Sequence, residues 1–66
     1  MRLAHKIKMF QDLVTKWTQI YDKHIEDVRQ AKRQGDKEKE NSAISLAKIA
    51  LMTMEDYKKV LNRIEG

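Results

Sequence analysis

The chain has 66 residues, a formal net charge of +4, two glycines, no proline and no cysteine. A chain this short forms at most one domain and buries only about 60% of the surface of its unfolded state, so its core is small. Because the lack of cysteine excludes disulfides and thiolate zinc sites, we expect self-association or a binding partner to supply the missing stability.

The N-terminal sequence MRLAHKIKMF has basic residues but no continuous apolar segment, so we expect no secretory signal. The longest apolar stretch covers about a dozen residues and is interrupted by Lys48, which makes it too short for a membrane span. We therefore expect a cytoplasmic protein that has no contact with a membrane.

The first predicted helix extends from about residue 3 to about residue 34. Its apolar residues recur at alternating spacings of four and three, which is typical of the seam of a coiled coil or helical bundle. Basic residues Lys32 and Arg33 in the last turn, followed by Gly35, predict where this helix ends. The seam positions are Leu3, Ile7, Phe10, Val14, Trp17, Tyr21, His24, Val28 and Ala31.

The second predicted helix extends from about residue 37 to about residue 64 and follows a turn at about residues 35–36. Asp36 is a suitable N-cap, although Asn41–Ser42 is a second possible start. The seam of this helix includes Leu46 and continues to Ile64. A short turn makes consecutive helices antiparallel. The predicted fold is therefore all-α, an antiparallel two-helix hairpin that forms a single domain over residues 1–66.

The segment 43–54 is unusually apolar, with nine apolar residues out of twelve. They cover about 220° of the helix surface, which is more than one neighbouring helix can bury. Since each large apolar side chain gains roughly 1.5–3 kcal/mol on burial, we expect an interface here. We favour a homodimer that forms a four-helix bundle, and the alternative is a surface for another protein. The predicted interface comprises Ala43, Ile44, Ala47, Ile49, Ala50, Leu51, Met52 and Met54.

The two histidines are the first candidates for chemistry. The His-x-x-Lys spacing of His5 and Lys8 resembles that of histidine phosphotransfer domains, where it would imply a phosphorylated histidine on a helical bundle. Met9 stands where that family usually has a small residue, so we interpret His5 as a surface residue of the first turn. For His24 we expect a local contact with Asp27 or a role in helix register, and a pH switch or a paired-histidine site is the alternative.

The other polar residues predict no reaction. Trp17 and Tyr21 have the spacing of core residues, and Tyr57 should face the aromatic residues of the first helix. The sequence has no glycine-rich phosphate loop and no pair of carboxylates on an apolar face. We therefore expect that the protein is not an enzyme and that it has no catalytic, cofactor-binding or metal-binding residue. The carboxylates are expected in solvated helical pairs. These are Asp12–Lys16, Lys23–Asp27, Glu26–Arg29 and Glu55–Lys59.

The positive charge lies in the first half of the chain. Residues 1–35 contain eight Lys or Arg and four Asp or Glu, whereas residues 36–66 contain six of each. We favour a small regulator or adaptor that binds protein, a type common in bacteria and phages. The alternative is a regulatory dimer that binds DNA or RNA through the basic first helix. The contacts to nucleic acid or to an acidic partner would be Arg2, Lys6, Lys8, Arg29, Lys32 and Arg33.

Overall fold

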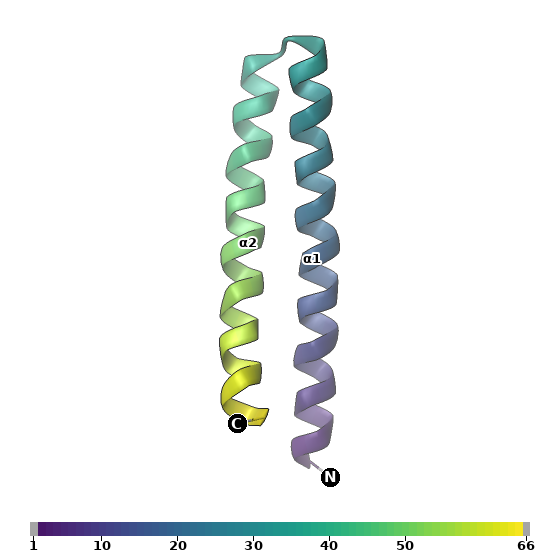
Figure 1. Ribbon diagram of the computed structural model, residues 1–66, viewed down its shortest axis with the longest axis vertical. Coiled ribbons are helices and arrows are strands. Elements are labelled where there is room, and N and C mark those ends of the chain that lie inside the picture. Colours follow the sequence, from purple (N-terminus) through teal and green to yellow (C-terminus); the bar gives the residue numbers. More distant parts are fainter. Residues whose placement is uncertain (1, 66) are drawn as a thin grey trace.

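The structure, a computed structural model, describes residues 2–65 and consists of two antiparallel helices. Helix α1 covers Arg2–Gln34 and helix α2 covers Lys37–Glu65. The helices lie side by side along their whole length and are joined at one end, so that both termini lie at the opposite end (Figure 1). The rod measures 51 × 14 × 12 Å. The predicted all-α hairpin is confirmed.

Helix α1 ends in a backbone motif that uses the one internal glycine. The Gly35 amide donates to the Lys32 carbonyl at 3.1 Å, and the Asp36 amide donates to the Ala31 carbonyl at 2.9 Å. This pair of bonds is the Schellman motif, which satisfies carbonyls at a helix C-terminus. Gly35 has a φ of 71°, a left-handed conformation in which a side chain is strained. Local sequence therefore ends the helix.

Helix α2 begins directly after this motif. The Asp36 carboxylate accepts a hydrogen bond from the Lys39 amide at 3.1 Å, which is the contact of an N-cap with the third residue of its helix. The second possible start, Asn41–Ser42, lies inside α2 and is not used. Asp36 thus completes the end of one helix and begins the next, which leaves a turn too short for any arrangement other than a hairpin.

The contact between the helices is built on small side chains. Among the described residues, the buried apolar ones are four alanines and one methionine, and no large side chain is fully buried. The predicted core residues Trp17 and Tyr21 are only half-buried, since α2 is the only other helix within residues 2–65 that can cover them. The buried residues are Ala31, Ala43, Ala47, Ala50 and Met54.

Larger side chains make the contact toward the open end of the hairpin. The rings of Phe10 and Tyr57 lie 5.9 Å apart at 49°, a tilted arrangement favourable for aromatic pairs. The Thr18 hydroxyl lies 2.7 Å from the Val14 carbonyl and 2.9 Å from the Met54 sulfur, so it links the two helices. The expectation that Tyr57 faces an aromatic residue of the first helix is confirmed. Neither helix, over residues 2–65, has a segment long and apolar enough to cross a membrane.

Candidate interaction surface

The structure divides the eight residues of the predicted interface into two groups. Ala43, Ala47, Ala50 and Met54 are 1–7% exposed, because they already form the contact with α1. Ile44 is half-buried, and the exposed large side chains of this group are Ile49, Leu51 and Met52. Only this second group remains available to a partner.

Leu46 adds to the available surface. The sequence predicts it in the seam between the helices, yet it is 47% exposed. At 100° per residue Leu46 lies about 100° from Ala47 around the helix, so it stands at the edge of the seam. That angular offset is readable in the sequence, but the amount of cover depends on how closely α1 approaches.

On one side of the seam the two helices enclose an apolar groove of about 170 Å³. We call it the apolar groove. Ala47 supplies its floor, and the only charged side chain in its lining is Lys48. Its α2 residues Ile44 and Leu51 follow one another at a spacing of seven, which places them on one side of the helix. The lining residues are Tyr21, Ile25, Val28, Ile44, Ala47, Lys48 and Leu51.

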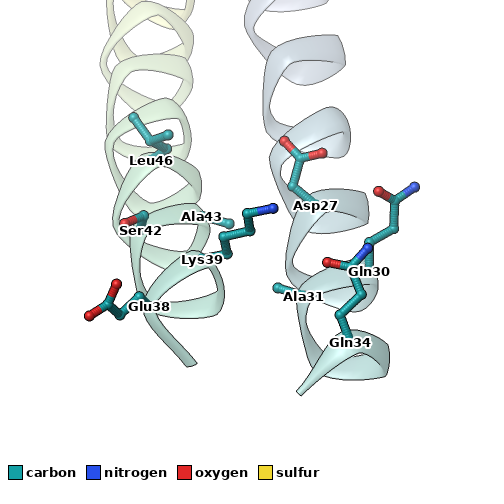
Figure 2. Close-up of a pocket in the computed structure, with 9 residues that line it drawn as sticks. All are labelled: Asp27, Gln30, Ala31, Gln34, Glu38, Lys39, Ser42, Ala43 and Leu46. Atoms are coloured by element: carbon teal, nitrogen blue, oxygen red, sulfur yellow. The ribbon is translucent and has the colours of Figure 1, made fainter. Parts of the chain in front are cut away.

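A second groove of about 500 Å³ lies nearer the turn, and we call it the polar groove. Figure 2 shows the Lys39 side chain reaching across it toward α1, where Asp27 also faces the groove. The ion pairs formed among residues 2–65 do not join Lys39 to Asp27. The lining residues are Asp27, Gln30, Ala31, Gln34, Glu38, Lys39, Ser42, Ala43 and Leu46.

The two grooves lie on opposite flanks of the seam. Leu46 and Ser42 line the polar groove, whereas Ile44 and Leu51 line the apolar one. Around α2, these pairs stand on either side of the buried Ala43 and Ala47 by helical geometry. The hairpin therefore presents two concave sides of different chemistry to its surroundings.

His24 has an unsatisfied ring nitrogen. Its Nδ1 is buried and has no hydrogen-bond partner. The nearest acid is Asp27, whose Oδ2 lies 3.8 Å away, which is beyond hydrogen-bond distance. The expected contact is thus present, because the Asp27 carboxylate lies next to the His24 ring, but the two side chains form no hydrogen bond. His5 and Lys8 are both exposed on the first turns of α1.

The residues predicted as cationic contacts lie in two groups near the ends of α1, and Lys16 and Lys23 stand between these groups. Lys6 and Lys8 lie near the open end, whereas Arg29, Lys32 and Arg33 lie near the turn. The 21 residues that separate Lys8 from Arg29 correspond to roughly 32 Å along a helix. Arg2 begins α1, but its side chain lies outside the described part. The five predicted cationic contacts whose side chains the structure describes are therefore not brought together on one surface.

The exposed ion pairs differ in detail from those expected. Arg29 lies 3.6 Å from Glu26, which confirms this pair. Glu55 approaches Lys58, at 3.9 Å, and the predicted partner Lys59 is not the one used. Partners at spacings of three and four differ by only a few tenths of a kcal/mol, so packing decides between them. Two further expected pairs are absent from residues 2–65 of the structure: Asp12–Lys16 and Lys23–Asp27.

No group of three or more His, Cys, Asp or Glu side chains within residues 2–65 is arranged to hold a metal ion. Comparison with protein-family models, with curated proteins and with solved structures finds no match to the chain.

Proposed function

We propose that this hairpin is a non-enzymatic regulator or adaptor that acts by binding protein through the exposed apolar side chains of α2. The supporting observation is the contrast between what α2 buries and what it exposes. It buries three alanines and Met54, while four of its larger apolar residues remain 37–67% exposed. These exposed residues are Leu46, Ile49, Leu51 and Met52.

The energetics favour a covered surface. Removing such a side chain from water is worth roughly 1.5–3 kcal/mol when burial is complete, whereas burying an alanine contributes much less. A domain of this size has only a few kcal/mol of net stability. A partner that covers these side chains therefore adds a free energy comparable with the whole stability of the lone hairpin.

The nucleic-acid alternative has less support. Phosphate-driven binding needs cations along one continuous track. The basic residues near the two ends of α1 are separated by residues 9–28, which contain four Asp or Glu and only two Lys. The proposal also places the chain in the cytoplasm, since it has no cysteine for the disulfides that are typical of oxidising compartments.

Site-specific photo-crosslinking in the cell tests the proposal. A photoreactive amino acid is introduced at Leu46, Leu51 or Met52 in turn, and Lys59 serves as the control. Lys59 lies on α2 seven residues after Met52, so it shares its side of the helix but is polar. We expect protein adducts from at least one apolar position and none from Lys59. Mass spectrometry then identifies the attached protein.

Two results would overturn the proposal. One is the absence of a protein adduct at all three apolar positions. The other is recovery of nucleic acid by the purified chain, with binding that weakens steeply as salt concentration rises, as expected when phosphate contacts release counterions. The second result would favour the DNA- or RNA-binding alternative.

A further inference from the structure

We propose that the apolar groove is covered by a second copy of the chain, so that two hairpins form a four-helix bundle. This inference rests on the proposed function and narrows it, because it names the protein that covers Leu51 and leaves Leu46, Ile49 and Met52 outside the contact.

Only one of the two grooves can be buried at low cost. The polar groove contains Asp27, Glu38 and Lys39, and its burial would remove these groups from water without an ion pair between them. In the apolar groove the only charged lining residue is Lys48. A lysine can lay its aliphatic stem on an apolar surface and keep the ammonium in water. The apolar groove is therefore the side that can be covered.

The shape of the apolar groove suits a copy of itself. A two-fold interface uses the same patch on both chains, so that patch must supply both the protrusions and the depression. Ala47 forms a low floor, and the branched side chains of Ile25, Ile44 and Leu51 stand around it. Tyr21 on α1 is half-buried and also borders this groove. A second hairpin placed here covers the side of each of these residues that the neighbouring helix of the same chain leaves exposed.

The exposed area agrees with a dimer of ordinary size. The hairpin exposes 5340 Å², whereas a compact monomer of its mass, 7.8 kDa, exposes about 4400 Å². The excess is roughly 900 Å² for each chain, or roughly 1800 Å² for two. Stable protein interfaces bury about 1200–2000 Å² in total. One second copy therefore accounts for the excess.

The charges at the rim select an orientation. Lys48 lies at the α2 edge of the apolar groove. On α1, Asp22 lies one turn before Ile25, which places it at the outer edge of the same groove by helical geometry. Neither residue takes part in an ion pair within residues 2–65. A two-fold axis along the rod puts α1 of one copy over α2 of the other, which brings Asp22 close to Lys48 of the partner subunit.

Sedimentation of purified variants tests the groove. The natural chain should sediment with the mass of two chains at micromolar concentration. Leu51→Lys should raise the dimer dissociation constant at least about a hundredfold, since two leucines leave the interface. Ile49→Lys is the matched control, because Ile49 is also exposed on α2 but lies about 160° away from Leu51 around the helix. It should leave the dimer unchanged.

A charge exchange tests the orientation with side chains whose replacement does not threaten folding. Asp22 and Lys48 are both exposed in the hairpin. Asp22→Lys alone should weaken the dimer roughly three- to tenfold, because it places like charges at the rim. The double variant D22K/K48D should restore the natural dissociation constant. Additive losses in the double variant would overturn the proposed orientation.

The outcomes separate this inference from the proposed function. A natural chain that remains monomeric at about 100 μM, a weak affinity for a biological dimer, would overturn the second copy. If the crosslinks at α2 then lead to a different protein, protein binding itself would stand. A dimer lost with Ile49→Lys and kept with Leu51→Lys would also overturn the assignment to the apolar groove. Helical circular dichroism, recorded for each variant, distinguishes dissociation from unfolding.

Discussion

The two sides of the seam share one pair of helices and one turn, yet they differ in what can cover them. The apolar groove has a single charged lining residue, whereas the polar groove has three. The difference in charge arises at positions that flank the seam. Ile44 and Leu51 line the apolar groove, whereas Ser42 and Lys39 line the polar groove. In a two-helix protein these flanking residues decide which side remains in water, because the seam is too narrow to form a core.

The largest expected effect comes from forcing the helices apart at their buried contact. Ala50 is 1% exposed, so Ala50→Leu overpacks the seam. We expect a loss of about 2–3 kcal/mol in the free energy of unfolding, measured by urea denaturation at fixed protein concentration. Ser45→Leu, on the exposed side of α2, should change it by less than about 0.5 kcal/mol. Equal losses would show that the alanine contact is not what holds the grooves open.

The next prediction compares the grooves directly. Ile25→Ser removes a branched side chain from the apolar groove, and Gln30→Ser makes a change of the same kind in the polar groove. We expect a loss of about 1–2 kcal/mol for the first and less than about 0.5 kcal/mol for the second. Thermal or urea denaturation measures both. If the two variants lose the same free energy of unfolding, the two grooves are equally solvated, which would contradict the difference between them.

The turn holds the register that aligns the two helices along both grooves. Gly35→Ala forces a side chain into a left-handed backbone, while the added Cβ meets no atom within 4 Å. The cost is therefore a backbone cost, about 1 kcal/mol, and should appear as a lower urea midpoint. Gly35→Asn should lose less, because asparagine tolerates this conformation better. A fully stable alanine variant would contradict the assigned backbone.

The smallest expected effect concerns the first turn of α2, which borders the polar groove. Asp36→Ala removes the acceptor of the Lys39 amide and should cost about 0.5–1 kcal/mol. Asp36→Asn keeps a capping oxygen and should stay within a few tenths of a kcal/mol of the natural chain. Both are measured by chemical denaturation. A larger loss for asparagine than for alanine would exclude capping as the role of Asp36.

Much of the fold could be predicted from the sequence because its signals are local. The alternation of four and three identifies each helix, and Gly35 and Asp36 identify the turn through their own backbone requirements. The surface was less predictable. Trp17 and Tyr21 were expected in a core and are half-buried, and Glu55 approaches Lys58 in place of Lys59. These outcomes depend on small energy differences among neighbours and on how far one helix covers another.

Local signals in the chain therefore define two helices, their ends and the hairpin that connects them, because hydrogen bonding and helical period act over a few residues. The packing of the two helices against each other places Ala43 and Ala47 under α1 and leaves Leu46 and Leu51 exposed on opposite flanks. The spacing of apolar residues in the sequence indicates which of them share a side of a helix. The rotation of that helix and its distance from its neighbour come from packing both helices together, and they determine which apolar residues are left for a partner.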